Sequence, residues 1–404
     1  MDWHDLAKMT GAISLTFDYA LADCMWKNNQ TELRLPALNH RKPMSNGHNP
    51  KLRLGMSLTE ARASSSNPGI PNGPSLPVVN FALVGQQAPI LLTTPTGKLP
   101  KATAVVITWA SAEWAALQQV FCGNAAMPYS DRTQGTWTGW EKYSANRPLG
   151  APSDWNYWGY YRLVQVGGNP VLLFKSNTHL DWPGAVYLEA LIKLIIADVM
   201  PNVILSVGTA GGANPEDHIG TVRAVSAGTL YQSGIPQSDW PTYENGWTAN
   251  KAILENVNFN QLLFPVPSRT TDLQTLCSQF NEQYGTTYML AQLNPTGLNL
   301  GDEIPQIYDQ TGGGASLLTT PTFVVGTTGG NYQMYTSIEM DDAIIGEVCA
   351  GSNTAFGFVR NISDPVQGAS LPAKVQGNWG GTIYDAYGFY TSYNGALTAC
   401  AMLV

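Results

Sequence analysis

SIEMDDAIIGEVCAGSNTAFGFVRNISDP, residues Ser337 to Pro365, is the stretch that decides the fold of this 404-residue chain. It begins with acids at an expected helix start, and a turn of Gly, Ser and Asn follows the helix. Phe356 to Arg360 then predicts a strand that leads to Asp364. The helix carries an apolar stripe at i, i+4 and i+8, made of Met340, Ile344 and Val348. Two acidic clusters therefore lie at neighbouring ends of a helix and a strand.

The composition limits the classes of function. The chain is 44% hydrophobic and only 12% charged, with 40 Gly and 26 Pro, which indicates a globular, loop-rich protein. The charged fraction is roughly half of the usual ~25%. A net charge of -8 and a pI near 5.1 argue against binding to a nucleic-acid backbone, which needs clustered Lys and Arg. We expect a small-molecule partner and no nucleic acid.

The cysteines and the N-terminus predict the cellular compartment. The five cysteines are widely spaced and include no CxxC pair, so we expect reduced, mostly buried thiols. No apolar run approaches the ~18 residues of a membrane span. The first residues, MDWHDLAK, carry acids where a secretory signal would be positive, which predicts a cytoplasmic protein. The histidines of the N-terminal region lack metal-ligand spacing, and we expect neither a metal nor a cofactor.

The pattern divides the chain into an extension and a main domain. Residues 1–98 are predicted as a loop-rich, partly helical N-terminal extension, since residues 36–77 are rich in Asn, Ser, Pro and Gly. Residues 99–404 form the main domain, with an insertion at about 232–322. The insertion contains one credible helix, which begins at Thr271 or Asp272. Its remaining part, through residue 316, has the texture of a loop.

The main domain begins with a strand and a helix that share an acidic turn. Ala104 to Thr108 predicts a buried parallel strand, and Ala112 to Phe121 the first helix. Glu113 lies at the turn between them. Ligands of α/β proteins bind outside the carboxyl ends of strands, which favours a functional role. A first-turn acid that stabilises the helix dipole is the competing interpretation of Glu113.

Further strands and helices continue the α/β pattern. Tyr160 to Val166 and Pro170 to Ser176 predict a hairpin that turns at Asn169-Pro170. The glycine-rich turn Gly208 to Gly212 follows a buried strand and allows close approach of a ligand to the backbone. The remaining predicted elements are a helix from about Pro183 to Met200 and strands at Val203 to Val207, Thr221 to Ser226 and Thr322 to Gly326.

Four separated segments resemble the nucleoside phosphorylase and nucleosidase superfamily. In chain order they are ATAVVITWASAEWAAL, VILSVGTAGG, SIEMDDAIIGEV and FGFVRNISDP. The superfamily includes purine nucleoside phosphorylases and methylthioadenosine/S-adenosylhomocysteine nucleosidases. The resemblance covers about residues 100 to 400 and implies a three-layer α/β/α fold with a mixed central sheet. It also implies a homo-oligomer, either a dimer or a trimer or hexamer.

The resemblance assigns roles to the acids of the opening stretch. Asp364 matches the general acid that protonates the departing purine, and Ser363 lies beside it. Met340 matches a residue that packs on the sugar, and Asp341 matches the acid that holds the sugar hydroxyls. The family usually has Glu at the position of Asp341, so either the helix sits closer or the sugar is not an ordinary ribonucleoside. Glu339 is a second candidate for orienting the sugar.

The nucleophile is indicated by two residues elsewhere in the chain. Ser206 stands where phosphorylases of the family have an Arg that clamps phosphate, and hydrolytic members have a small residue there. Glu113 matches the acid that activates water in the nucleosidases. Further residues expected to bind the substrate are Thr209, Ala210 and Gly211 on the anomeric side of the sugar, and Tyr332 near the family's base-stacking aromatic.

These features predict an N-ribosyl hydrolase that cleaves the N-glycosidic bond of a purine nucleoside or a 5'-modified purine nucleoside. One alternative is a phosphorylase that draws its phosphate cation from Lys175, Arg223 or a neighbouring subunit. Another is a nucleoside-binding protein without catalysis. His179 either faces the sugar 5'-position or is a satisfied loop histidine, and we expect the latter. Arg360 is expected to brace the last strand or an acid.

Overall fold

The computed structural model describes residues 76–123, 139–153, 155–180, 183–214, 217–265, 270–293, 305–320, 332–365 and 371–404. The chain divides into two compact units, one formed by Met1–Met44 with Asn146–Asn156 and the other by Ser45–Ala145 with Tyr157–Val404. All of the helices and strands discussed below belong to the second unit.

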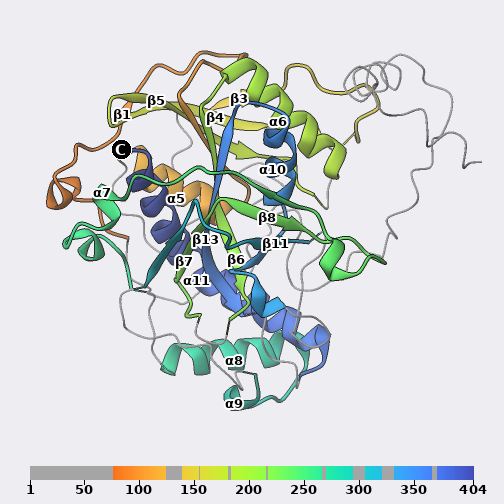
Figure 1. The fold of residues 1–404 in the computed structure, drawn as a ribbon. Helices are drawn as coiled ribbons and strands as arrows, with labels where there is room; N and C mark the ends of the chain where they lie inside the picture. Colours follow the sequence, from red (N-terminus) through yellow and green to blue (C-terminus); the bar gives the residue numbers. More distant parts are fainter. Residues whose placement is uncertain are drawn as a thin grey trace, which may run out of the picture. The chain divides into compact units, whose positions relative to one another are not determined.

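The strands of this unit form one mixed sheet (Figure 1). They are β1 Ile90–Leu91, β2 Ala104–Thr108, β3 Glu141–Tyr143, β4 Gly159–Val166, β5 Asn169–Ser176, β6 Val203–Gly212, β7 Val222–Val225, β8 Ala227–Leu230, β9 Thr242–Glu244, β10 Ile307–Gln310, β11 Leu317–Thr319, β12 Ile338–Glu339 and β13 Ala355–Pro365. Among the described residues the main strand order is β1-β4-β5-β2-β6-β12-β11-β8-β9. β13 runs parallel to β6 and antiparallel to β7, so the predicted mixture of directions is confirmed.

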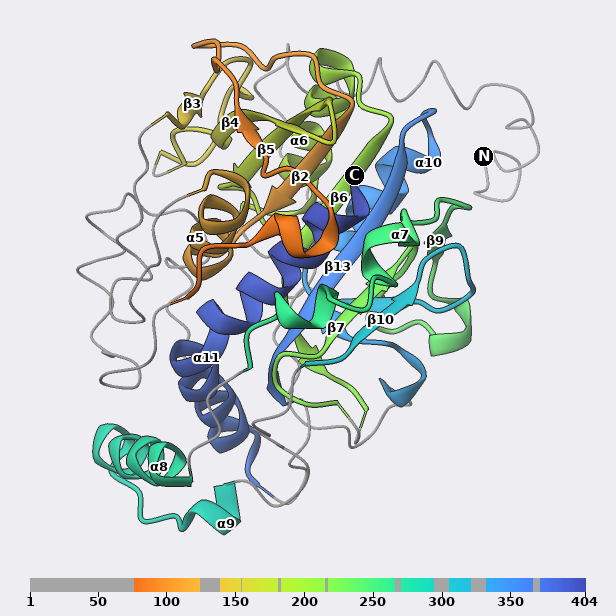
Figure 2. The same cartoon turned by 90° about the vertical axis from the view of Figure 1, so that its left-hand side faces the viewer.

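Helices cover both faces of the sheet (Figures 1 and 2). The α-helices are α5 Ser111–Phe121, α6 Ala185–Val199, α7 Lys251–Leu254, α8 Thr270–Tyr284, α9 Leu290–Leu293, α10 Asp342–Ala350 and α11 Ala373–Met402. Short 3-10 helices are η1 Phe81–Val84, η3 Gln237–Asp239, η4 Phe259–Gln261 and η5 Tyr332–Met334. α5 packs on α11, and α6 packs on α10. The expected three-layer α/β/α arrangement is therefore present.

Alternating residues of β2 explain why helices are needed on both faces. Ala104 and Val106 join the core that also contains α5 and α11. Val105 and Ile107 point to the opposite face of the strand and are also fully buried. A strand that is apolar on both faces is stable only when both are covered, as is usual for parallel strands.

The longest helix, α11, has no counterpart among the elements predicted from the sequence. Its residues include several glycines and many Tyr, Thr and Asn, which are weak helix formers. The helix forms because it packs along β13 and α5. At Gly395 the backbone approaches β13 so closely that a Cβ atom would lie 2.5 Å from the Asn361 side chain.

Several predicted boundaries were wrong. The hairpin turns at Gly167 and Gly168, both with positive φ, while Asn169 and Pro170 already belong to β5. A pair of residues with φ > 0 is what the right-handed twist of a hairpin favours. The expected turn Gly208 to Gly212 is the end of β6, which stays paired with β13 through Gly212. Met340 precedes α10 instead of lying in it.

Other predictions differ from the observed structure or fall outside the described residues. The predicted loop before residue 316 contains β10, which pairs with β7. Within the predicted extension, β1 pairs with β4 and so joins the sheet. The helical part of the predicted extension, which the sequence places at Gly11 to Trp26, lies outside the described residues. The same holds for the strand expected at Thr322 to Gly326 and for Cys24. The remaining cysteines are free and buried: Cys122, Cys277, Cys349 and Cys400. No helix in the described ranges has the length and hydropathy of a membrane span.

Candidate active site

Two of the segments that carry predicted site residues pair with Gly211, near the end of β6. Gly211 pairs with Ile338 of β12 on one side and with Asp364 of β13 on the other. Because β2, β6 and β13 run parallel, their carboxyl ends lie at one end of the sheet. Ligands of α/β proteins bind at that end.

The carboxylate of Glu113, in the first turn of α5, is buried and has donors at both oxygens. Its Oε1 accepts hydrogen bonds from the N–H and the hydroxyl of Thr209 at 2.7 and 2.8 Å. Its Oε2 accepts from the hydroxyl of Thr108 at 2.8 Å and from the N–H groups of Trp109 and Ala110 at 3.0 and 2.8 Å. Glu113 therefore ties the start of α5 to the end of β6.

The surroundings of Glu113 favour its ionised form. Burial by itself raises the pKa of Glu113, but the Arg360 charge and the N–H donors outweigh it, so the pKa lies below its ordinary value. The bond from Ala110 is the helix-capping contact that the first-turn interpretation predicts. The bonds from Thr209 place the same carboxylate at the expected ligand-binding end of the sheet. Both interpretations of Glu113 thus agree with its position.

Arg360 of β13 is the centre of a buried polar network. Its Nε donates to Asp342 at 2.7 Å, and its Nη2 donates to the Ser206 hydroxyl at 2.8 Å and pairs with Glu339 at 3.2 Å. The Ser206 hydroxyl donates to Asp342 at 2.5 Å. Burial lowers the pKa of Arg360, but the neighbouring carboxylates more than reverse this effect. Arg360 braces an acid, as predicted, and the Ser206 hydroxyl is engaged within the protein.

Glu339 holds the first turn of α10. Its carboxylate accepts from the N–H of Asp341 at 2.6 Å and from the N–H of Asp342 at 3.1 Å, and it also accepts from the Thr319 hydroxyl. Burial and the Asp342 charge raise the pKa of Glu339 to about 8, although Arg360 opposes the rise. Glu339 was predicted to orient the sugar, and these contacts instead direct its carboxylate into the protein.

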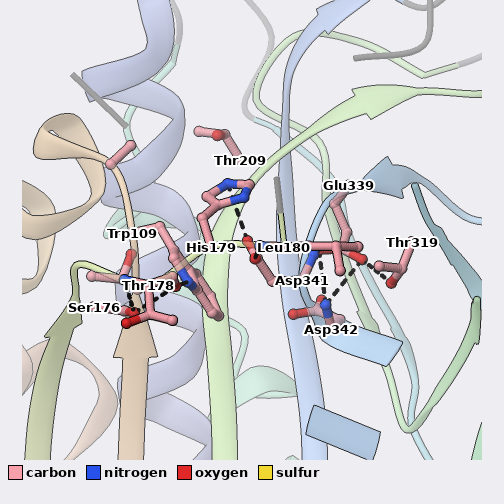
Figure 3. Close-up of polar contacts among 12 residues, drawn as sticks. Trp109, Ser176, Thr178, His179, Leu180, Thr209, Thr319, Glu339, Asp341 and Asp342 are labelled. Carbon is pink, nitrogen blue, oxygen red and sulfur yellow. Dashed lines mark hydrogen bonds and ion pairs between the residues drawn. The ribbon is translucent and has the colours of Figure 1, made fainter. Parts of the chain in front are cut away.

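Asp341, the N-cap residue of α10, contacts the loop that follows β5 (Figure 3). Its Oδ1 accepts from the N–H of Leu180 at 3.0 Å, and its Oδ2 lies 3.2 Å from Nε2 of His179. Burial raises the pKa of Asp341 to about 6, and the charges of His179 and Arg360 oppose the rise. Met340, the residue before it, is also buried.

Asp364 lies at a β-bulge. The register between β13 and β6 shifts between Ile362 and Asp364, and the intervening Ser363 donates its hydroxyl to Asp364 Oδ1 at 2.7 Å. A bulge changes the direction of a side chain at a strand end and is common next to active sites. Asp364 is 4% exposed and pairs with Gly211 in the sheet.

The other predicted site residues surround the same strand end. Thr209, Ala210 and Gly211 are consecutive residues of β6. Tyr332 begins η5 and packs, partly buried, in an aromatic cluster beside Ala213, which directly follows β6. This cluster also contains Tyr231 and Trp240, whose rings are 4.8 Å apart.

Three residues of the site were missed or underrated from the sequence. Asp342 received no role, yet it is the closest partner of Arg360. His179 was expected to be a satisfied loop histidine, and its partner is the sugar-binding candidate Asp341. Lys175 is 1% exposed. Burial lowers the pKa of Lys175 to about 7, and the charge of the nearby Glu113 opposes this lowering. The two consecutive Asp residues of EMDD could have indicated a role for Asp342 from the sequence alone.

The described residues contain no cluster of three or more His, Cys, Asp or Glu arranged to hold a metal ion. The candidate site contains the polar network and the aromatic cluster near the carboxyl ends of β6 and β13.

The chain is similar to solved structures of nucleosidases. A 5'-methylthioadenosine/S-adenosylhomocysteine nucleosidase from Neisseria meningitidis, in complex with methylthio-immucillin-A, is 14% identical over 74% of this chain and 97% of its own, with a TM-score of 0.42. Futalosine hydrolase of Helicobacter pylori is 13% identical over 74% and 96%, with a TM-score of 0.40. A nucleosidase from Colwellia psychrerythraea, in complex with adenine, is 14% identical over 77% and 96%, with a TM-score of 0.40.

These proteins belong to the superfamily that the sequence motifs resemble. No family model matches the chain, and no curated protein matches its sequence. At these identities and TM-scores the similarity carries no argument about substrate or mechanism. The function proposed next rests on the contacts of this chain's own residues.

Proposed function

We propose that the protein is a nucleosidase that hydrolyses the N-glycosidic bond of a purine nucleoside or a 5'-modified purine nucleoside. The observation that carries this proposal is the arrangement around β6. Thr209 bonds Glu113, and two residues later Gly211 pairs with Asp364. Two buried carboxyl groups from different elements thus lie beside one short segment of β6. Cleavage of an N-glycosidic bond needs an acid and a base close to the same bond.

Asp364 acts as the general acid in this proposal. When the bond between C1' of the sugar and the purine nitrogen breaks, the electron pair goes to the purine, which leaves poorly as an anion. A proton from Asp364 neutralises the base as it departs. The hydrogen bond from Ser363 holds one oxygen of the Asp364 carboxyl group, and we assign to Ser363 the role of orienting the acid.

The water that attacks C1' gives up its proton through Thr209. Glu113 is ionised, but its oxygens already accept from Thr209 and from the start of α5. The Thr209 hydroxyl is more accessible than Glu113 and donates to it at 2.8 Å. We therefore assign Thr209 as a relay: its proton passes to Glu113 while it receives the proton of water. The water oxygen forms the new bond to C1', and the products are free base and free sugar.

The phosphorylase alternative is disfavoured by the partners of the nominated cations. Arg223 pairs with Asp217 at 2.6 Å and stacks on the Tyr308 ring. Lys175 is buried and donates to the Ser176 carbonyl at 3.0 Å. Ser206, at the position of the phosphate-binding Arg, bonds Asp342 and Arg360. Within the described chain, these contacts engage both cations that the alternative names, as well as the residue at the position of the phosphate-binding Arg; a cation from a neighbouring subunit is left to the phosphate experiment.

The experiment is incubation of the full chain with adenosine, inosine, methylthioadenosine, AMP and pyrimidine nucleosides in phosphate-free buffer. Chromatography detects the products. We expect release of free base from the purine nucleosides and no release from the pyrimidine nucleosides. Tight binding of a purine nucleoside by calorimetry without base release would instead establish a non-catalytic binding protein.

A further inference from the structure

The loop between β5 and α6 is fixed against the end of β2. The Ser176 hydroxyl donates to the Thr178 carbonyl at 2.7 Å and accepts from the Thr178 N–H at 2.9 Å. The indole N–H of Trp109, directly after β2, donates to the same carbonyl at 2.8 Å. Residues 176–179 are all buried, although loops are usually exposed. The protein therefore places His179 by its own contacts (Figure 3).

This loop engages both oxygens of Asp341. The Leu180 N–H donates to Oδ1, and Nε2 of His179 lies within ion-pair distance of Oδ2. The Asp341 side chain is 3% exposed and that of His179 is 6% exposed, so little solvent competes with the pair. Asp341 comes from the start of α10 and His179 from the loop before α6, and their contact joins two segments that are far apart in sequence.

The neighbouring acids of the EMDD segment are also engaged within the protein. Glu339 accepts from Asp341, Asp342 and Thr319. Asp342 accepts from Arg360 and Ser206. The acceptors of this segment are thus paired by protein donors before any sugar binds.

A protein recognises a sugar hydroxyl through a hydrogen-bond acceptor, such as a carboxylate oxygen, to which the hydroxyl donates. A site discriminates strongly, by about 10⁴- to 10⁵-fold, when the missing hydroxyl would leave a buried polar group of the protein unpaired. The oxygens of Asp341 are paired by His179 and Leu180 whether or not a 2'-hydroxyl is present. Loss of that hydroxyl therefore carries no such penalty here.

We propose that His179 sets the sugar specificity of the site, and that the protein cleaves 2'-deoxyribonucleosides at least as well as the matching ribonucleosides. This proposal rests on the nucleosidase function proposed above. It adds the class of sugar, 2'-deoxyribose, that the same site accepts.

The test compares kcat/KM for 2'-deoxyadenosine with adenosine, and for 2'-deoxyinosine with inosine, by release of base in phosphate-free buffer. For the wild-type protein we expect the deoxynucleoside to equal or exceed the ribonucleoside. His179→Ala frees Oδ2 of Asp341, and we expect the preference to move toward the ribonucleoside by about 10-fold or more through its KM. His179→Gln retains an N–H donor and should restore the wild-type preference. Lys193→Ala, an exposed change on α6, is the control.

The outcomes separate the two claims. A wild-type kcat/KM that is higher for the ribonucleoside than for the deoxynucleoside in both pairs would overturn the specificity proposal and leave the nucleosidase function standing. The same holds if folded His179→Ala, checked by thermal melting, keeps the wild-type preference. Release of base from none of the four nucleosides, and from neither methylthioadenosine nor AMP, would overturn the nucleosidase function and this proposal with it.

Discussion

At the scale of single residues, Asp364 is the group whose chemistry the nucleosidase proposal needs most. We expect Asp364→Asn to lower kcat by about 100- to 10,000-fold, because an amide cannot supply the proton to the departing base. Ser363→Ala removes only the 2.7 Å hydrogen bond that orients the acid, and we expect a smaller loss. Base release by purified, folded variants is the measurement. Full activity of Asp364→Asn would show that another group is the acid.

Thr209 provides a second residue-scale prediction. Thr209→Val has nearly the same shape but no hydroxyl, so it breaks the relay to Glu113 and should lower kcat by about 100-fold with little change in KM. Thr209→Ser keeps the hydroxyl and should retain most of the activity. Steady-state kinetics of both variants check this. Equal kcat values for the Val and Ser variants would rule out the relay.

The sequence predicted several of these residues because their signal is local. Glu113 lies in a strand-to-helix turn, and Asp364 lies at a strand end, so each position follows from its own segment. The contact between His179 and Asp341 joins residues that are more than a hundred positions apart, and no pattern within either segment indicates it. The inward orientation of Glu339 likewise depends on Thr319 of another strand.

At the scale of elements, Glu339, whose carboxylate holds the first turn of α10, links the stability of the protein to pH. Burial and the Asp342 charge raise the pKa of Glu339 from 4.5 to about 8 in the folded protein. The folded state therefore binds this proton more tightly than the unfolded state. The resulting stability is fully present below the ordinary pKa and is lost as the pH rises through the folded-state pKa.

Glu339→Gln removes this titration. We expect the Tm of the wild-type protein to fall, relative to that of Glu339→Gln, as the pH rises from about 5 to about 8. Asp341 titrates in both proteins, so the difference between the two curves reports Glu339 together with its effect on the neighbouring acids. Thermal melting across this pH range is the measurement. Parallel Tm curves would mean that the pKa of Glu339 is not raised by folding.

The packing of α11 on β13 makes a further element-scale prediction. Gly395→Ala would place a Cβ atom 2.5 Å from the Asn361 side chain, and we expect it to destabilise the fold by about 1–3 kcal/mol. Gly246→Ala is the matched control, since no heavy atom lies within 4 Å of the position that its Cβ atom would take. Chemical unfolding measures both. A Gly395→Ala variant as stable as the control would contradict the close approach of α11.

Sequence patterns were accurate for the apolar elements and failed where packing overrides propensity. β2 has the predicted bounds, and α5 and α6 begin and end within two residues of their predictions. α11 was not predicted, since its Gly, Tyr and Asn content gives no strong helical pattern and its stability comes from contacts with β13 and α5. β6 runs on through its glycines because β13 pairs with it throughout.

At the scale of the whole molecule, the second compact unit contains every residue assigned to the site. The resemblance to the nucleoside phosphorylase and nucleosidase superfamily implied a mixed sheet covered on both faces, and the sheet has that architecture. The domain boundary near residue 98, the homo-oligomer and the cytoplasmic location remain predictions. Burial patterns within one chain do not carry the information that would decide these three points.

The choice between water and phosphate as nucleophile is the central claim of the account, and one measurement tests it directly. The rate of base release from a purine nucleoside is measured as phosphate is added, and the sugar product is identified by ³¹P NMR. Because Ser206, Arg223 and Lys175 are engaged within the protein, we predict a rate independent of phosphate and a sugar that carries no phosphate at C1'. A rate that rises with phosphate, together with a sugar 1-phosphate signal, would contradict the account.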